Sequence, residues 1–300
     1  HPNERKLSKL EEQMQRQLLS LNGVDITEVY SPERVNAYAS EYGLTAGTSM
    51  DLTTRDHDGR AWNFDEQEMR ERAWERIKKE KPMCVIGSPM CTNFSILMNV
   101  NWKKMSREEI NERWSKAVMH LEFCASLYRL QIDEGRYFLH EHPLSATSWK
   151  LPCIENLMND QRVIKTKAHM CAYGMESVDD QGAGLVYKPT GFMTNSWAVA
   201  DELSRTCTNE NNQTRAHRHV HLLNNRARRA QEYPAALCRA ICKGIHQQKS
   251  SDEKKEYLIG NISKASGPRE ARRKYEEATE VSSKAHGEGR TANWEEELAE

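Results

Sequence analysis

Apolar residues recur with helical spacing at residues 7–21 and in two later stretches of the chain. The clearer helix opens at Ser106, has Glu109 three residues later as the second half of a capping box, and carries an apolar stripe that ends at Ile132. A second helix is expected over residues 66–80, where charged positions surround one apolar face, and it ends before Pro82. Both stripes are typical of helices that pack against a core.

Short apolar runs alternate with these helices and predict strands. They cover residues 24–30, a run that ends at 51–52, residues 83–86 and residues 137–139. Strands that alternate with helices through short links favour a parallel, doubly wound sheet, so the expected fold class is α/β with a mostly parallel sheet. Beyond residue 163 the pattern changes to short strands and turns, which predicts a small C-terminal strand and loop region.

These patterns divide the chain into three segments. Residues 1–21 are expected to form an amphipathic leader helix, residues 22–248 the main domain with a small separate region over 163–225, and residues 249–300 a charged tail that is helical or disordered. The chain begins with His1 rather than Met, which suggests excision from a longer open reading frame.

Composition narrows the range of partners. The 300 residues carry a net charge of -1, so binding to nucleic acid would need a local basic patch, and the densest candidate is the run 215–229. No apolar run approaches the roughly 20 residues of a membrane span, so no membrane partner is expected. The eight cysteines form no C-x-x-C pair, and with no secretion signal we expect reduced thiols and an intracellular protein, nuclear or cytoplasmic.

Polar clusters follow three of the expected strands, at residues 28–32, 87–95 and 141–143. The carboxyl ends of parallel strands are where such sheets bind ligands. Cys91 lies in a proline-stiffened loop where backbone N–H groups favour a thiolate, and Glu141 ends another strand. A thiolate and a carboxylic acid at one site suit covalent attack on an electron-poor ring; the alternative is a structural cysteine.

Two of these segments resemble motifs of the DNA cytosine-5 methyltransferase family. Residues 87–95 (GSPMCTNFS) are similar to its nucleophile motif G-G-P-P-C-Q-x-F-S, and residues 138–143 (FLHEHP) are similar to its motif F-L-x-E-N-V. The resemblance implies that Cys91 is the nucleophile and Glu141 the catalytic acid. Residues 226–241 are similar to the family's closing helix motif, and short blocks elsewhere resemble methylase-like domains of phages and mobile elements.

The resemblance also implies a Rossmann-like methyltransferase fold over residues 22–248, with 163–225 as a small target-recognition-like region. It implies S-adenosyl-L-methionine as cofactor and DNA as partner. Lys165 and Lys167, which alternate on one face of a strand, would contact the cytosine and the nearby backbone as part of the catalytic set. The expected cofactor-binding residues are Glu28, Tyr30, Asp51, Asp65 and Pro89.

The sequence departs from the family pattern in several places. The turn at residues 27–32 has no glycine, and Met90, Thr92 and His142 replace motif residues. The first expectation is therefore an active methyltransferase, and the alternative is a catalytically silent nucleic-acid-binding module of a mobile-element polyprotein. A cysteine-dependent hydrolase with His140 or His142 as base is a third possibility.

A second group of polar residues has a possible metal-binding pattern. Cys207, His217, His219 and His221 form C-x(9)-H-x-H-x-H, and strand alternation would place the three imidazoles on one face. Because this spacing is not a standard zinc spacing, we expect no metal and keep the zinc site as the alternative.

Overall fold

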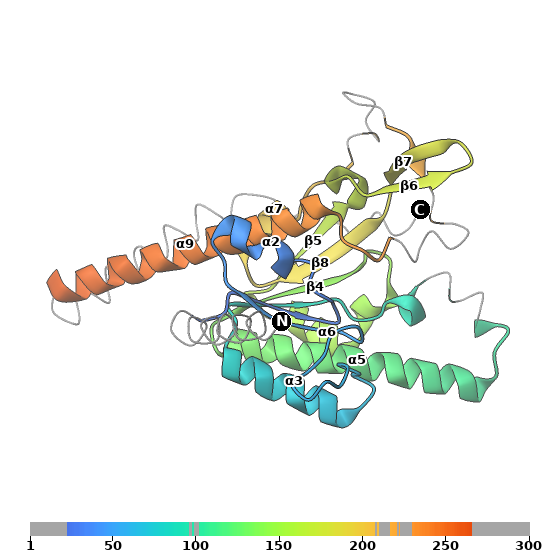
Figure 1. The fold of residues 1–300 in the computed structure, drawn as a ribbon, viewed down its shortest axis with the longest axis horizontal. Coiled ribbons are helices and arrows are strands. Elements are labelled where there is room, and N and C mark those ends of the chain that lie inside the picture. The colour runs from blue at the N-terminus through green and yellow to red at the C-terminus, as the bar shows by residue number, and fades with distance from the viewer. Residues whose placement is uncertain are drawn as a thin grey trace, which may run out of the picture. The chain divides into compact units, whose positions relative to one another are not determined.

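A six-stranded, mostly parallel sheet forms the centre of the computed structural model (Figure 1). Its strands are β1 (Ile26–Val29), β2 (Ala46–Met50), β3 (Cys84–Gly87), β4 (Tyr137–Pro143), β5 (Ile164–His169) and β8 (Pro189–Thr194). Their order is β2-β1-β3-β4-β8-β5, and β8 runs antiparallel to both of its neighbours. The prediction of an α/β fold with a mostly parallel sheet is confirmed.

The structure describes residues 23–95, 98, 102–207, 209, 217–220, 222 and 230–265. The expected leader helix 1–21 and residues 266–300 of the expected tail lie outside these residues. The chain divides into two compact units, residues 1–248 and 249–300. Within the described ranges, no helix combines the length and the apolar character that a bilayer crossing requires.

Helices cover both faces of the sheet. They are α2 (Asn36–Ala39), α3 (Gln67–Glu80), α5 (Arg107–Asp133), α6 (Pro152–Met158), α7 (Trp197–Glu202) and α9 (Ala235–Ala265), with short 3-10 turns η1 (Ser40–Tyr42), η2 (Thr92–Phe94), η3 (Thr147–Lys150) and η4 (Met170–Tyr173). The Ser106–Glu109 capping box opens α5 as predicted. Figure 1 shows α3, α5 and α6 on one side of the sheet and α2 and α7 on the other.

Strand alternation divides the interior into two apolar cores. On β3, Val85 points into a core shared with α3, α5 and α6, whereas Ile86 points into a core shared with α2, α7 and α9. The expected apolar face of α3 is buried in the first core. We refer to the two faces of the sheet as the α5 face and the α9 face.

A second, three-stranded sheet forms the small region. Its strands are β6 (Glu176–Asp179), β7 (Gly182–Val186) and β9 (His219–Val220), in the order β6-β7-β9. The first two form a hairpin, and β9 pairs with β7 in parallel through only two residues. Strands and turns were predicted for this part of the chain.

The chain changes direction across the main sheet between β1 and β3. β2 lies on one side of β1 and β3 on the other, so the carboxyl ends of β1 and β3 flank a topological switch point, the usual ligand-binding position of such sheets. Gly87 ends β3 against Tyr128 of α5, where an added Cβ would lie 1.9 Å from the Tyr128 hydroxyl oxygen. That hydroxyl is paired with His140 Nδ1 at 3.1 Å. The close approach requires glycine here.

Gly87→Ala is therefore expected to lower the free energy of unfolding by about 1–3 kcal/mol, because the added methyl group must displace the Tyr128 ring. In a Tyr128→Phe background the loss should be smaller, since the nearest remaining ring atom would lie 2.8 Å away. Urea unfolding of the four proteins of this double-mutant cycle measures the coupling. Strictly additive effects would contradict the proposed contact.

Candidate functional site

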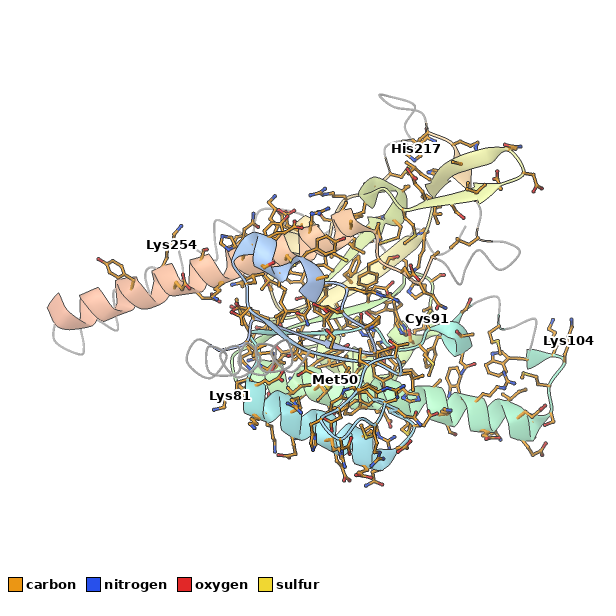
Figure 2. The ribbon with its side chains drawn as sticks, in the orientation of Figure 1. Met50, Lys81, Cys91, Lys104, His217 and Lys254 are labelled. Atoms are coloured by element: carbon orange, nitrogen blue, oxygen red, sulfur yellow. The ribbon has the colours of Figure 1, made fainter. Side chains whose placement is uncertain are left out.

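Cys91 and Glu141 lie at the same edge of the main sheet. β3 and β4 are parallel neighbours with Gly87 opposite His140, so the loop that follows β3 emerges beside Glu141. Figure 2 labels Cys91 in this loop. The Cys91 thiol is half-buried and the Glu141 carboxyl is buried, and the Glu141 charge raises the pKa of the thiol. The two predicted catalytic residues are brought together.

Glu141 lies within β4 rather than after it, which corrects the expected end of this strand at residue 139. β4 continues to Pro143 because β8 pairs with it along that length, with Glu141 opposite Phe192 and Pro143 opposite Thr190. Phe192 belongs to the core of the α9 face. The Glu141 side chain therefore projects to the α9 face.

Lys188 and Tyr233 complete this site and were absent from the predicted set. Lys188 Nζ lies 3.5 Å from Glu141 Oε1 and donates to the carbonyl of Ala230 at 3.2 Å. Tyr233 pairs through its hydroxyl with Ser88 in the Cys91 loop, at 2.7 Å. Glu141 Oε1 is buried and has no hydrogen-bond partner among the described residues. The Lys188 ammonium therefore balances the Glu141 charge without a hydrogen bond to Oε1.

Burial decides the protonation state of Cys91. Desolvation raises the pKa of the thiol most strongly, the Glu141 charge raises it further, and the Lys188 charge lowers it. The sequence had predicted that the loop would favour a thiolate. In the structure, η2 is a single short turn, and its backbone contributes less than burial does. The protein without ligand therefore holds Cys91 as a neutral thiol at neutral pH.

His142 fixes the loop that carries Cys91. Its Nε2 lies 3.1 Å from the carbonyl oxygen of Pro89, which only accepts, so Nε2 carries the proton and donates. Its Nδ1 then accepts from the Ser148 hydroxyl at 2.6 Å. Burial lowers the pKa of His142 to about 4, which keeps the ring neutral. His142 thus holds the loop through Pro89.

Lys165 and Lys167 lie on one face of β5, as their alternation predicted. Through β8, Lys165 shares its face with Met193 and His140, which is the α5 face, opposite Glu141. Lys165 Nζ lies 4.2 Å from the centroid of the Trp149 ring, and burial lowers its pKa to about 8. Grouping these lysines with Glu141 was wrong, because the antiparallel β8 fixes a register that local alternation does not reveal.

Glu28, a predicted cofactor residue, holds the start of α2. Its carboxylate accepts hydrogen bonds from the backbone N–H groups of Arg34, Val35 and Asn36 and from the Ser31 hydroxyl, at 2.9–3.2 Å. Burial nevertheless raises its pKa. The Ser49 hydroxyl is a fifth donor, at 3.4 Å, and together these donors give the carboxylate a structural role within the chain.

Tyr30 and Asp65, two further predicted cofactor residues, are joined through His120. The Tyr30 hydroxyl pairs with His120 Nδ1 at 2.7 Å, and His120 Nε2 pairs with Asp65 at 3.0 Å. Asp65 also accepts from Lys116 at 2.7 Å. Tyr30 has a φ of 62°, the left-handed conformation that glycine adopts more easily, and its ring packs 4.7 Å from that of Phe64. A tyrosine ring therefore fills the space beside the turn that follows β1.

Asp51 follows β2 and Pro89 follows β3, two strands of the main sheet that have β1 between them. Asp51 follows the last residue of β2, is half-buried, and accepts from the backbone N–H and hydroxyl of Thr53 through Oδ1. Pro89 precedes Cys91 by two residues. Among the described residues, the Asp51 carboxylate accepts hydrogen bonds only from its near neighbour Thr53, whereas the other two predicted cofactor-binding carboxylates, Glu28 and Asp65, bond to residues farther along the chain.

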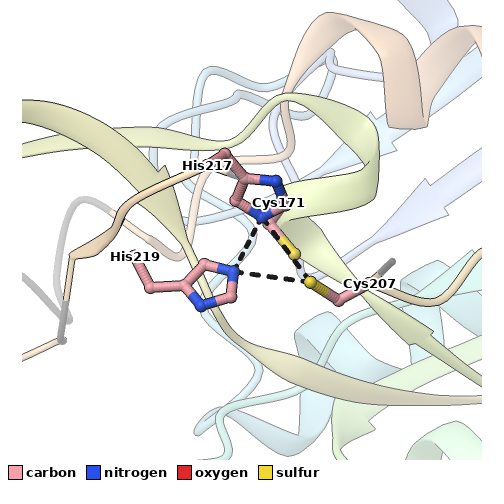
Figure 3. A group of neighbouring side chains, drawn as sticks. All are labelled: Cys171, Cys207, His217 and His219. Carbon is pink, nitrogen blue, oxygen red and sulfur yellow. Dashed lines mark hydrogen bonds between the residues drawn. The ribbon is translucent and has the colours of Figure 1, made fainter. Parts of the chain in front are cut away.

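The alternative metal ligands converge, with one addition. Cys207, His217 and His219 lie together with Cys171, and the four ligand atoms are within 4.8 Å of one another (Figure 3). Cys171 was not predicted, and His221 lies outside the described residues. This cluster could hold a metal ion.

The predicted basic run 215–229 lies mostly outside the described residues. Within it, Arg218 pairs with both carboxylate oxygens of Asp179, at 2.7 and 2.8 Å, and donates to the carbonyl of Gly182. Its guanidinium therefore ties β9 to the β6–β7 hairpin.

Comparisons with known proteins identify no relative of this chain. No family model matches the sequence, no curated protein matches it, and no solved structure is significantly similar. Function is therefore inferred from the side chains and their chemistry.

The charges around Cys91 predict its reactivity. Iodoacetamide should alkylate Cys91 slowly at pH 7 and faster as the pH approaches and passes the ordinary thiol value near 9.0. Glu141→Gln should accelerate alkylation at pH 8 and Lys188→Met should slow it, each by about two- to tenfold, since one pKa unit changes the thiolate fraction tenfold. Peptide-resolved mass spectrometry measures the rates.

Cys153, the other half-buried cysteine, is the internal control for this measurement, and its rate should stay constant in both variants. Equal Cys91 rates in the wild type and both variants would contradict the proposed electrostatic coupling.

Buried neutral histidines predict acid sensitivity. The unfolded chain protonates His142 near pH 6.5 and the folded chain only near 4, so stability present above pH 6.5 is lost as the pH falls through this window. The loss is at most about 1.4 kcal/mol per pH unit for one proton. His142→Asn should remove this share of the slope of unfolding free energy against pH, while the exposed His246→Gln control should not. Urea unfolding between pH 7.5 and 4.5 tests it, and an unchanged slope in His142→Asn would refute it.

Proposed function

We propose that this chain is a DNA cytosine-5 methyltransferase-like protein that acts through Cys91 and Glu141, with S-adenosylmethionine as methyl donor. The observation that supports it best is that the half-buried thiol and the buried carboxyl lie at the carboxyl edge of two paired parallel strands, close enough for the Glu141 charge to raise the pKa of the thiol. The order of the main sheet, with one antiparallel strand before its last strand, is compatible with a Rossmann-like methyltransferase core.

The chemistry requires a target base outside the DNA stack, because ring carbon 6 is not reachable within a duplex. Cys91 Sγ would then bond to carbon 6, and the thiol proton would leave to solvent. Glu141 would engage ring nitrogen 3, which makes carbon 5 electron-rich. Carbon 5 would then take the methyl group that the donor supplies, and loss of the carbon 5 proton to solvent water together with elimination of Sγ would restore the ring.

Lys188 and His142 would support this chemistry without touching the reacting carbon. The Lys188 ammonium, 3.5 Å from Glu141, lowers the pKa of Cys91 and so opposes the effects of burial and of Glu141. His142 holds the Pro89 carbonyl and thereby the position of the thiol. Both residues are positioning residues in this proposal.

The residues beside β1 and β2 fit the methyl donor only in part. Asp51 would accept from the ribose hydroxyls, and the loop at Pro89 would lie along the donor. Glu28 accepts from five internal donors, and Tyr30 and Asp65 are joined through His120. S-adenosylmethionine would supply an electrophilic methyl group for carbon 5.

The alternative is a silent nucleic-acid-binding module, and Tyr30 favours it. The ring at the turn after β1 packs beside Phe64 and Phe123, at the place where the family's glycine lets the backbone approach the methionine part of the cofactor. A chain that has lost the donor site would keep the sheet and the Cys91 loop without transferring methyl groups.

Two assays on the full chain separate these functions. The first is transfer of labelled methyl groups from S-adenosylmethionine to DNA. The second is release of tritium from carbon 5 of cytosine in DNA, because addition of Cys91 lets carbon 5 exchange its hydrogen with water even without a donor. Cys91→Ala and Glu141→Gln should lower both activities at least about a hundredfold, the range of nucleophile and acid–base contributions. Cys153→Ala is the matched control and should retain them.

Each outcome has a defined meaning. Methyl transfer that depends on Cys91 supports the enzyme. Tritium release without methyl transfer places the defect in the donor site and supports the catalytic pair alone. Absence of both activities in a chain that still binds DNA establishes the silent module, and methyl transfer by Cys91→Ala overturns the assignment.

A further inference from the structure

Among the residues that the structure describes, one cluster of metal-ligating side chains lies outside the proposed catalytic pair. Cys171 belongs to η4, directly after β5; Cys207 follows α7; His219 belongs to β9, and His217 precedes it. Three separate segments thus meet at one point. Both cysteines are buried, both histidines are half-buried, and no disulfide joins the two thiols.

The sulfur–nitrogen distances within the cluster match those of a tetrahedral site. Zn–S and Zn–N bonds of about 2.3 and 2.05 Å give a sulfur–nitrogen edge of about 3.5 Å. Cys207 Sγ lies 3.6 Å from His217 Nε2 and 3.5 Å from His219 Nε2. The two Nε2 atoms are 2.8 Å apart and face each other, so both rings present the same nitrogen to the centre of the cluster (Figure 3).

The surroundings are those of a thiolate ligand. The backbone N–H of Asn209 donates to Cys207 Sγ at 3.4 Å, and its side-chain amide donates to the carbonyl of His217 at 2.8 Å. The backbone N–H of Cys207 donates to His169 Nδ1 at 2.9 Å. Such hydrogen bonds orient metal ligands, and the one to sulfur stabilises its negative charge.

The small sheet supplies a reason for such a site. β9 pairs with β7 through only two residues, and few apolar side chains of the β6–β7 hairpin are buried. Small substructures with little core are commonly stabilised by a metal ion. We propose that Cys171, Cys207, His217 and His219 bind one zinc ion that fixes the small sheet to the end of β5.

The ligand set defines the kind of site. Two thiolates and two imidazoles complete a tetrahedron and leave no position for water, so the ion is structural. Zinc is preferred because this borderline-soft donor set suits it and because it needs no redox partner. Because only the deprotonated thiolate ligates the ion, metal binding displaces the thiol protons.

The first test is metal content. The full chain, purified without chelator, should contain about one zinc per chain by atomic emission, as a single four-ligand site requires. Cys171→Ser and Cys207→Ser should each lower this to below about a tenth. The controls Cys153→Ser and His246→Gln, at positions outside the cluster, should retain one zinc.

The second test does not depend on the ligand variants folding well. Cobalt(II) added to metal-free wild-type chain should give the intense visible bands of tetrahedral coordination and a thiolate-to-cobalt charge-transfer band, and one equivalent of zinc should abolish both. The same metal-free chain should unfold at a lower temperature than the zinc-loaded chain. Wild-type chain that binds neither metal, or zinc content unchanged in Cys171→Ser and Cys207→Ser, would overturn the proposal.

Discussion

Parallel pairing of β3 with β4 is the constraint on which the candidate catalytic site depends. The register sets Gly87 opposite His140, so the loop after β3 and the outer half of β4 share one edge. Gly87 permits this pairing because any larger residue would meet the Tyr128 ring. His142, two residues beyond His140, then donates a hydrogen bond to the Pro89 carbonyl and holds the Cys91 loop beside β4. A backbone register and a single side-chain hydrogen bond thus determine where the Cys91 thiol lies.

Two opposing charges and the desolvation of the thiol determine whether Cys91 is a neutral thiol or a thiolate. Burial and Glu141 favour the neutral thiol, and Lys188 favours the thiolate. A ligand that protonates Glu141, or donates a hydrogen bond to it, would weaken the negative charge beside the thiol. That charge is one of the two effects that hold Cys91 neutral. Activation of the nucleophile would then be coupled to occupancy of the site, which protects the thiol from side reactions in the free protein. A thiolate in the free protein would lack this coupling.

The sequence predicted those features that depend on residues close together in the chain. Strand and helix alternation predicted the mostly parallel sheet, and the Ser106–Glu109 pair predicted the start of α5. The face of Lys165 could not be predicted, because it depends on pairing with β8, which lies later in the chain. Cys171 was missed because it is remote in sequence from the other three cluster ligands, and only the end of β5 brings it to them.

Residues 187 and 188 connect the two polar sites of the molecule. The Tyr187 ring lies 5.1 Å from the ring of His219, a proposed zinc ligand, and 4.8 Å from that of His169. The next residue, Lys188, forms an ion pair with Glu141 and directly precedes β8. Fixing the His219 ring would restrict the Tyr187 ring that packs beside it. Because Tyr187 and Lys188 are consecutive residues, this also restricts the backbone at Lys188. The small sheet therefore has a physical route to the charge that lies beside the candidate catalytic acid, although its metal ligands contribute nothing to the reacting group.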